Sequence, residues 1–350
     1  MRCLLVTGGA GFIGSCLVRH LVQNRLARVV TLDKLTYAGH RSSLRAVLDD
    51  PLHEFVQGDI GDAPLVASLL AAHRPQAILH LAAESHVDRS ILAPAAFIDT
   101  NVTGTFRLLQ AALDYWRSLD AEAQQRFRFL QISTDEVFGS CDEPGRFAED
   151  AHYRPTSPYS ASKAAGDHLA DAFTRTYGLP TIRTYCSNNY GPYQFPEKLI
   201  PLMTVRAVRR QPLPVYGDGQ QVRDWLHVED HCRALLAVLA RGTVGEAYNI
   251  AGKCERTNLS VVQRICEIID ELRPETGQPA RASLISLVED RPGHDRRYAL
   301  DVRKIERALG WRPTVDFDRG LRETVAWYLE HSEWVAEVMV DVQPGESVAP

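Results

Sequence analysis

Short apolar runs alternate with longer amphipathic segments along the first half of the chain. The runs are typical of strands that are buried on both faces of a parallel sheet, and we expect strands at 3–6, 29–32, 54–57, 77–81, 129–132 and 181–185. The segments between them repeat their apolar residues at a helical period, which predicts helices over 13–24, from 63, over 94–119 and over 158–177. This alternation predicts an α/β fold of the Rossmann type, with a doubly wound parallel sheet.

The pattern loosens after residue 186. Helices are expected over 199–210 and 259–272, a strand over 247–250, and two short helices that finish near 335. We therefore expect residues 1–186 to form the first domain, with some later segments returning to it. Residues 187–335 are expected to form a smaller, mixed α/β C-terminal domain, and 336–350 a disordered tail.

A glycine-rich turn links the first predicted strand to the first predicted helix. Its spacing is Gly8-x-x-Gly11-x-x-Gly14, which permits a tight turn and close approach of the backbone to a pyrophosphate at the helix N-terminus. The next strand ends in Asp33, about 20 residues on, where an acid binds a ribose hydroxyl in such folds. The first domain is thus predicted to bind a dinucleotide, and the acid favours NAD over NADP because a carboxylate would repel a 2′-phosphate.

Composition narrows the class of protein. The chain has 350 residues and a net charge of −5, with no basic stripe that would indicate a nucleic-acid partner. The seven Cys include no C-x-x-C pair, which suits a reducing cytoplasm, and no motif indicates a metal site. No apolar run reaches membrane-spanning length, and the first strand begins too early for a signal peptide.

Two polar clusters carry the candidate chemistry. Thr134, Asp135 and Glu136 directly follow a predicted strand, where catalytic groups lie in such sheets. Both acids can reach one ligand only if the strand ends before them, so we expect a loop or helix to start at Asp135. Tyr159 and Lys163 are four residues apart near the start of a helix, and a fixed ammonium should lower the pKa of the phenol and make it a base. The alternatives are a solvated loop for the acids and a chance pairing for Tyr and Lys.

The motifs in this order resemble the extended short-chain dehydrogenase/reductase superfamily. They are the glycine turn, Asp33, Asn101 and the Tyr159–Lys163 pair. Within this superfamily the chain is most similar to the sugar-nucleotide dehydratases. The segments that carry this similarity are residues 33–39, 81–90, 133–137, 187–192, 223–225 and 291–298. The likeness runs from Met1 to about Val335. Two departures are Phe138, where that family usually has Tyr, and a short loop over 140–153.

The resemblance implies a hydro-lyase that converts dTDP-glucose to its 4-keto-6-deoxy product in deoxysugar (rhamnose-type) biosynthesis. NAD would take a hydride from C4 and return it to C6. Tyr159 would be the base that Lys163 tunes, and Thr134 would hold the C4 oxygen. Glu136 would remove the C5 proton, and Asp135 would protonate the departing hydroxyl. The alternatives are another NAD-dependent sugar-nucleotide dehydratase or an epimerase, or a redox-inactive NAD-binding regulator.

The resemblance also implies the binding residues and a homodimer formed through a four-helix bundle from the helices around 100–119 and 157–177. The implied cofactor contacts are Gly8, Gly11, Phe12, Ile13, Gly14, Asp33, Lys34, Leu35, Thr36, Asp59, Ile60, Leu81, Ala82, Ala83, Ser85, Thr100, Tyr159, Lys163 and Asn189. The implied sugar-nucleotide contacts are Ser85, Thr134, Asn188, Lys198, Leu199, Pro214, Tyr216, Arg223, Asn258, Asp290, Arg291 and His294. From the residues alone, a helix cap is the favoured interpretation of Asp59 over a contact with the adenine, and surface salt bridges are favoured for Arg223 and Arg291. Tyr216 has a half-buried packing role as its alternative.

Overall fold

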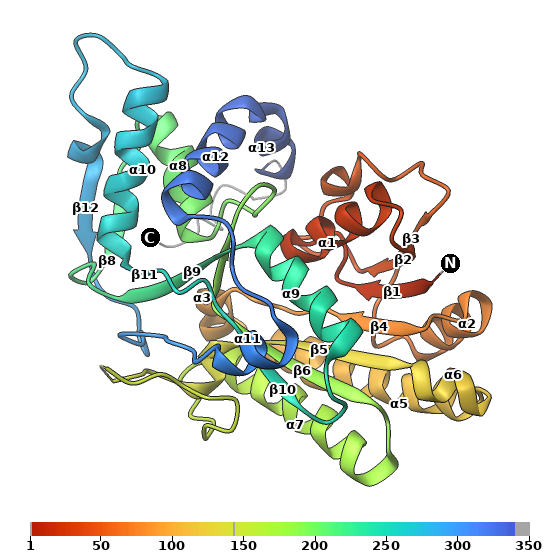
Figure 1. Ribbon diagram of the computed structural model, residues 1–350. Helices are drawn as coiled ribbons and strands as arrows, with labels where there is room; N and C mark the ends of the chain where they lie inside the picture. The colour runs from red at the N-terminus through yellow and green to blue at the C-terminus, as the bar shows by residue number, and fades with distance from the viewer. Residues whose placement is uncertain (1, 143, 340–350) are drawn as a thin grey trace.

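The computed structural model describes residues 2–142 and 144–339, and a parallel sheet forms its centre (Figure 1). Within this part of the chain, seven strands lie in the order β10-β6-β5-β4-β1-β2-β3, with every neighbouring pair parallel. The strands are β1 Cys3–Thr7, β2 Arg28–Asp33, β3 His53–Gln57, β4 Ala77–His80, β5 Arg128–Thr134, β6 Thr181–Cys186 and β10 Ala247–Ile250. The predicted doubly wound sheet is confirmed. The chain reverses direction across the sheet between β1 and β4, which places a ligand crevice at their carboxyl ends.

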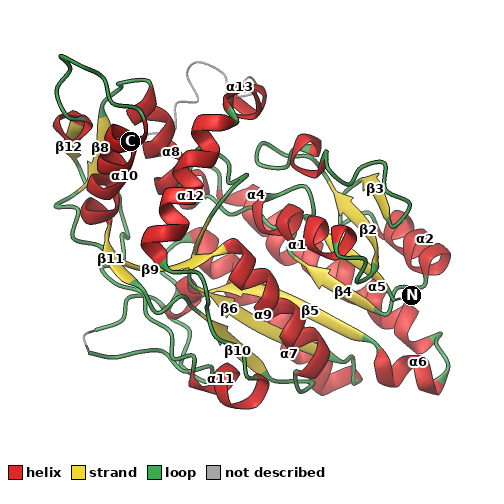
Figure 2. Ribbon diagram, turned by 45° about the horizontal axis from the view of Figure 1, so that its top comes forward, coloured by secondary structure: helices red, strands yellow, loops and turns green. Residues whose placement is uncertain are grey.

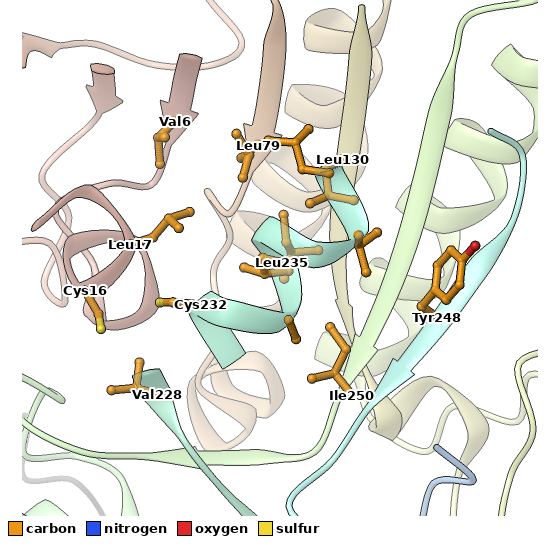
Figure 3. Close-up of a cluster of buried hydrophobic side chains, with 14 of the residues drawn as sticks. Val6, Cys16, Leu17, Leu79, Leu130, Val228, Cys232, Leu235, Tyr248 and Ile250 are labelled. Atoms are coloured by element: carbon orange, nitrogen blue, oxygen red, sulfur yellow. The ribbon is translucent and has the colours of Figure 1, made fainter. Parts of the chain in front are cut away.

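Helices cover both faces of this sheet (Figures 1 and 2). One face packs against α1 Phe12–Gln23, α9 Val228–Arg241 and α11 Arg303–Leu309; the other packs against α2 Ala63–His73, α5 Thr105–Arg117 and α7 Pro158–Tyr177. Figure 3 shows the first of these cores, where Leu17 of α1 and Leu235 of α9 point toward Leu79 and Leu130 of the strands. These apolar side chains recur at the helical period that predicted the helices, so each helix buries one face.

The helix predicted over 94–119 is interrupted. It consists of α4 Pro94–Ile98, a π-helical turn over Asp99–Gly104, and α5. A π turn holds an extra residue, so it rotates the residues that follow while the apolar pattern continues. Two further short helices, α3 Val87–Leu92 and α6 Ala121–Arg126, were not predicted.

The remaining elements lie beyond the carboxyl end of the sheet. A small mixed sheet contains β7 Asn188–Tyr190, β9 Val222–His227 and β11 Glu255–Thr257, and β8 Leu213–Tyr216 pairs with β12 Ile285–Val288. The helices of this region are α8 Leu199–Val208, α10 Asn258–Leu272, α12 Phe317–Glu330 and α13 Ser332–Met339. A short 3-10 turn also lies here at Arg281–Leu284, and two others lie earlier in the chain at Arg41–Leu44 and Asp135–Phe138. Its core is a separate cluster around Ile265 of α10 and Leu321 of α12.

The C-terminal prediction needs one correction. Helix α13 continues to Met339, so residues 336–339 are helical and not part of a disordered tail. Trp334 and Val338 are buried and join Phe195 in a small apolar cluster, which gives the last helix a face to pack. The rest of the predicted tail lies outside the described residues.

Candidate active site

One cleft at the carboxyl ends of β1, β2, β4 and β5 collects most of the predicted site residues. The residues predicted from the glycine turn and the second strand that line it are Gly8, Gly11, Phe12, Ile13, Gly14, Asp33, Lys34 and Thr36. The other predicted cofactor residues that line it are Asp59, Ile60, Leu81, Ala82, Ala83, Ser85, Thr100, Tyr159, Lys163 and Asn189. Thr134, Asp135, Glu136, Asn188, Lys198 and Leu199 line the same cleft. Leu35 is the predicted cofactor residue that the lining lacks.

The glycine turn lets two backbone segments approach closely. A Cβ on Gly8, which has φ +69°, would lie 2.5 Å from the backbone N of Ala82, and a Cβ on Gly14 would lie 2.1 Å from the carbonyl oxygen of Gly8. Helix α1 follows with Gly11 as its N-cap and no side-chain cap. Its first N–H groups therefore remain available to an anionic phosphate at the edge of the cleft.

Asp33 is held in place by the backbone. Its carboxylate accepts hydrogen bonds from the N–H of Ala10 and of Leu35, both at 2.8 Å, while burial raises its pKa against those bonds. Leu35 adopts φ +58° and does not line the cleft. Its contribution is the backbone N–H that it donates to Asp33. The carboxylate is thus fixed where the second strand ends, as a ribose-binding acid requires.

Asp59 does not cap a helix. Its carboxylate accepts from the N–H of Gly61 and forms an ion pair of 2.6 Å with Lys34, whereas Asp62 caps α2 through the N–H of Leu65. The helix-cap reading of Asp59 is therefore wrong, and the residue instead joins the loop after β2 to the loop after β3.

The two acids begin a 3-10 turn where β5 ends, as predicted. Strand β5 runs to Thr134, and the Thr134 side chain caps the turn by accepting from the N–H of Glu136 at 3.3 Å. Burial, and then the charge of Glu136, raise the pKa of Asp135 well above its ordinary value. Burial also raises the pKa of Glu136, but Arg291, Lys198 and Arg223 oppose that rise. The two carboxyl groups therefore have unequal surroundings, and those of Asp135 disfavour the ionised form more strongly than those of Glu136 do.

Tyr159 and Lys163 lie at the start of α7. Ser157 caps this helix in a capping box with Ser160, and Pro158 occupies the first turn. Burial and the charge of Glu136 raise the pKa of Tyr159 well above its ordinary value, and only a hydrogen bond from Thr134 lowers it among the main influences. The prediction that Lys163 lowers the pKa of Tyr159 is therefore wrong for the chain without bound ligands. The Lys163 ammonium donates to the carbonyl oxygen of Ile132 at 2.7 Å, and burial of the phenol dominates.

The remaining predicted sugar-nucleotide residues all lie outside the cleft lining. Pro214 and Tyr216 come from β8, Arg223 from β9, Asn258 from the start of α10, and Asp290, Arg291 and His294 from the loop after β12. Asp88 of α3 links two of them, because it accepts from Tyr216 at 3.3 Å and from Arg291 at 3.1 Å. This group is connected to the cleft by charge, since Arg223 and Arg291 act on Glu136.

The contacts argue against the surface-salt-bridge alternative for Arg223 alone, because Arg291 does form an ion pair, with Asp88, that is part-buried. The Arg223 side chain is 5% exposed, donates to the carbonyl oxygen of Asp295 and lies 4.3 Å from the ring centre of Tyr298, so it is not a surface salt bridge. Arg291 pairs with the part-buried Asp88. The Tyr216 ring meets the His294 ring edge to face at 6.0 Å. Asn258 donates its N–H to the Gln221 carbonyl and leaves its buried Oδ1 without a partner.

Sequence reasoning missed Glu197, which is 5% exposed in the cleft wall. The Tyr37 hydroxyl donates to its Oε1 at 3.2 Å, and Arg89 Nε lies 3.8 Å from Oε2. Burial raises the pKa of Glu197 to about 7. The sequence offered one indication of Glu197, its position directly before the predicted substrate residue Lys198. The residues that contact Glu197 are far away along the chain and could not be inferred from spacing. Phe138, which stands where the family usually has Tyr, is buried and does not line the cleft. The centre of its ring lies 4.9 Å from that of Tyr185.

Fold and cleft together define a class of enzyme. A parallel sheet with a glycine turn after β1, an acid at the end of β2 and a Tyr-x-x-x-Lys helix beside the end of β5 is that of the extended short-chain dehydrogenases/reductases. The family model described as GDP-mannose 4,6 dehydratase matches residues 5–324. The dTDP-glucose 4,6-dehydratase 1 of Escherichia coli K12 is 55% identical over 344 residues, which cover 96% of this chain and 95% of that one. The chain belongs to the dTDP-glucose 4,6-dehydratase family.

Other relatives agree. The dTDP-glucose 4,6-dehydratase of Xanthomonas campestris strain B100 is 57% identical and covers 97% of this chain and 96% of its own. The crystal structure of DesIV, a dTDP-glucose 4,6-dehydratase from Streptomyces venezuelae solved with NAD and TYD bound, matches with TM-score 0.88 and 47% identity over 96% of this chain and 100% of that one. A UDP-glucose 4-epimerase from Thermotoga maritima matches less closely, with TM-score 0.82 and 29% identity over 95% of this chain and 100% of that one.

Proposed function

We propose that the protein is an NAD-dependent hydro-lyase that converts dTDP-glucose to dTDP-4-keto-6-deoxyglucose and water. One observation carries this proposal. Two neighbouring buried carboxyl groups, with unequal surroundings, lie in the same cleft as the Tyr159–Lys163 pair. An oxidation at C4 alone needs only the Tyr-Lys pair, whereas elimination of water needs a base and an acid beside it. The residues of the cleft fit NAD, because the glycine turn and the uncapped N-terminus of α1 suit a pyrophosphate and Asp33 suits a ribose hydroxyl.

The side chains of the cleft divide the acid–base work. Bound NAD supplies the hydride chemistry, accepting a hydride from C4 and returning it to C6. Tyr159 takes the proton of the C4 hydroxyl, and Thr134 holds that oxygen. Glu136 removes the C5 proton, which the new 4-keto group has made acidic, and Asp135 gives a proton to the C6 hydroxyl so that it leaves as water. Glu136 then returns its proton to C5, and the proton that Tyr159 took from the C4 hydroxyl replaces the one that Asp135 gave to the departing water.

The group around Asp88 is the proposed binding site for the nucleotide end of the substrate. Arg223 and Arg291 supply guanidinium groups for the diphosphate, and Tyr216 offers an aromatic face for the base. Pro214, Asn258, Asp290 and His294 complete this side of the site. In this proposal the residues of the central sheet hold NAD, and the elements from β7 onward, apart from those that return to the sheet, hold the sugar nucleotide.

We further propose that the enzyme is a cytoplasmic homodimer. Apolar side chains that face solvent in this chain include Ile98 of α4, Phe106 of α5 and Tyr177 of α7, with exposed fractions of 48%, 44% and 45%. Such a group is typical of an interface, and pairing α5 and α7 with their copies would form a four-helix bundle. Seven free cysteines favour a reducing compartment. In the described part of the chain, the helices are too short or too polar to span a membrane, and no three His, Cys, Asp or Glu residues are grouped to hold a metal ion.

The test is incubation of the purified protein with dTDP-glucose and either NAD or NADP. We expect the 4-keto-6-deoxy product, detected by mass spectrometry, with NAD preferred because Asp33 would repel a 2′-phosphate. The Asp33→Ala variant should lose part of that preference. Conversion of dTDP-glucose to its C4 epimer without loss of water would instead identify an epimerase. Equal or better use of NADP would contradict the role of Asp33.

A further inference from the structure

Helix α7 carries a buried acid that the proposed reaction does not use. Asp167 lies one helical turn beyond Lys163, so the two side chains share a face with Tyr159. Asp167 is 0% exposed and Lys163 is 7% exposed. Asp167 is not part of the cleft lining, so it has no direct route to a ligand. A fully buried carboxylate without a role is costly, and this one needs an explanation.

The ammonium and the carboxylate bind consecutive residues of one strand. Lys163 Nζ donates to the carbonyl oxygen of Ile132 at 2.7 Å, and Ser133 Oγ donates to Asp167 Oδ2. Both contacts lie near the end of β5, directly before the catalytic Thr134. Among the described residues Lys163 forms no ion pair within 4.0 Å, so Asp167 acts on it through space and not by direct contact.

Lys163 stands in surroundings that disfavour its charge. Burial lowers its pKa, and Asp167 is the foremost group that raises it, followed by Cys186 of β6. From β4, His80 faces the ammonium as a neutral ring, since burial lowers its pKa to about 3. An opposite charge within a few ångströms of a buried group typically shifts its pKa by 1–3 units. Among the main influences on Lys163 in the described part of the chain, Asp167 is therefore the one carboxylate placed to compensate for the buried ammonium.

Asp167 itself is ionised near neutral pH. Burial raises its pKa to about 6, against the opposing effects of Lys163, of Ser133 and Gln131 from β5, and of Arg183 from β6. The Tyr153 hydroxyl faces its Oδ2 at 3.5 Å and pairs with Tyr185 of β6 at 2.6 Å. Above about pH 6 the carboxylate is thus present, and below it the compensation for Lys163 is lost.

We infer that Asp167 is a positioning residue that keeps Lys163 protonated and its ammonium fixed at the end of β5. It does not touch the substrate; its effect reaches Tyr159 and the bound cofactor through Lys163. The catalytic consequence rests on the proposed function, whereas the charge state of Lys163 does not, so the two can fail separately.

The direct test is NMR of the full chain labelled with ¹³C at the lysine ε-carbons. The chain has five lysines, at 34, 163, 198, 253 and 304, so a Lys163→Arg sample assigns the signal. In the Asp167→Asn variant we expect the pKa of Lys163 to fall by about one unit or more, because an opposite charge has been removed. The matched control is Asp171→Asn, which removes a carboxylate one turn further along α7 that pairs with Arg175 and Arg183.

A second measurement covers the case in which Asp167→Asn does not fold. In the unmodified protein the Lys163 signal should show an inflection near pH 6, where Asp167 titrates. Ser133→Ala removes a hydrogen bond that favours the carboxylate, so it should move this inflection to higher pH. No inflection in the unmodified protein, or an unchanged pKa of Lys163 in a folded Asp167→Asn, would overturn the inference.

The kinetic readout is the pH dependence of cofactor reduction after rapid mixing with dTDP-glucose. In Asp167→Asn the alkaline limb should move to lower pH by about one unit, because Lys163 loses its proton earlier. An equal loss of rate at every pH would show a merely structural role and contradict the inference. If the unmodified protein makes no 4-keto product, the proposed function fails, while the NMR result still decides the role of Asp167.

Discussion

Asp135 and Glu136 are adjacent in sequence but face different charges. Asp135 is 3% exposed, so burial raises its pKa most, and the charges of Glu136 and Asp224 raise it further against the opposing charge of Arg223. Glu136 faces three cations, Arg291, Lys198 and Arg223, that favour its carboxylate. Unequal surroundings of this kind separate the two pKa values, and this difference supports the acid role proposed for Asp135 and the base role proposed for Glu136. The roles can be separated by experiment because each acid serves a different bond of the sugar.

In the Glu136→Gln variant we expect oxidation at C4 to continue while exchange of the C5 hydrogen with deuterated water nearly stops. The amide keeps the shape of the side chain but cannot act as a base. Loss of a general base typically costs about 10²–10⁴-fold in rate. Reduced cofactor should therefore accumulate on the enzyme, as seen by absorbance after rapid mixing.

The Asp135→Asn variant is the matched comparison. It lacks the acid and retains the base, so C5 exchange should persist better than loss of the C6 hydroxyl. A collapse of the cleft would suppress both signals in both variants. Normal C5 exchange and normal product formation in Glu136→Gln would place the base at another residue.

Residue spacing predicted the positions of these groups but not their surroundings. The Tyr159–Lys163 spacing and the end of β5 before Asp135 follow from helix and strand periodicity, and both agree with the structure. The pKa of Tyr159 does not follow from spacing, because it depends on burial beneath residues from other elements. Glu197 was missed for the same reason: Tyr37 and Arg89, which face it, lie more than a hundred residues away.

At the scale of elements, the π turn over Asp99–Gly104 shapes the cleft wall. Asn101 in this turn accepts from the N–H of Glu84, and its side-chain amide donates to the carbonyl of Glu84 and to Ser162 Oγ, each at 2.9 Å. The turn therefore ties the loop after β4 to helix α7. The sequence predicted one continuous helix here, since an extra residue in one turn barely disturbs an apolar pattern that continues on both sides.

Replacing Asn101 with Ala should loosen that loop. The Glu84 backbone groups would lose their partners, and each unsatisfied buried group costs about 1–3 kcal/mol. We expect a lower free energy of unfolding in denaturant titrations and weaker NAD binding by calorimetry, because Ala82, Ala83 and Ser85 line the cleft. Thr103→Ala, in the same turn but exposed, is the control. Unchanged NAD affinity in Asn101→Ala would show that the loop holds its shape without this side chain.

At the scale of the molecule, the site joins parts of the chain that are remote in sequence. Asp88 of α3, Tyr216 of β8 and Arg291 of the loop after β12 meet in one hydrogen-bonded group. The alternation of strands and helices predicted the central sheet, because helices separate most of its consecutive strands up to β6. The same pattern could not arrange the later elements, whose short strands pair across long stretches of chain.

The exposed apolar side chains of α4, α5 and α7 make the dimer testable. Phe106→Glu places a charge beside the ring of Phe173, which in turn contacts the ring of Tyr177. Burial of this surface in an interface would then become costly. We expect this variant to sediment as a monomer at concentrations where the unmodified protein is a dimer. Leu287→Glu, which alters an even more exposed apolar side chain on β12, should not change the sedimentation. A monomeric unmodified protein would contradict the proposed assembly.

The return of β10 to the central sheet has a consequence during synthesis. This strand pairs with β6 along Ala247–Ile250, although the other strands of the sheet are complete by Cys186. When β6 has left the ribosome, the edge of the sheet formed by β6 is still unpaired. About sixty more residues must be synthesised before β10 can pair with it, which takes on the order of several seconds. An uncovered edge offers unpaired N–H and C=O groups to other chains. Slow translation through this interval should thus favour aggregation of the nascent chain, and a fragment that stops at residue 186 should need a chaperone to remain in solution.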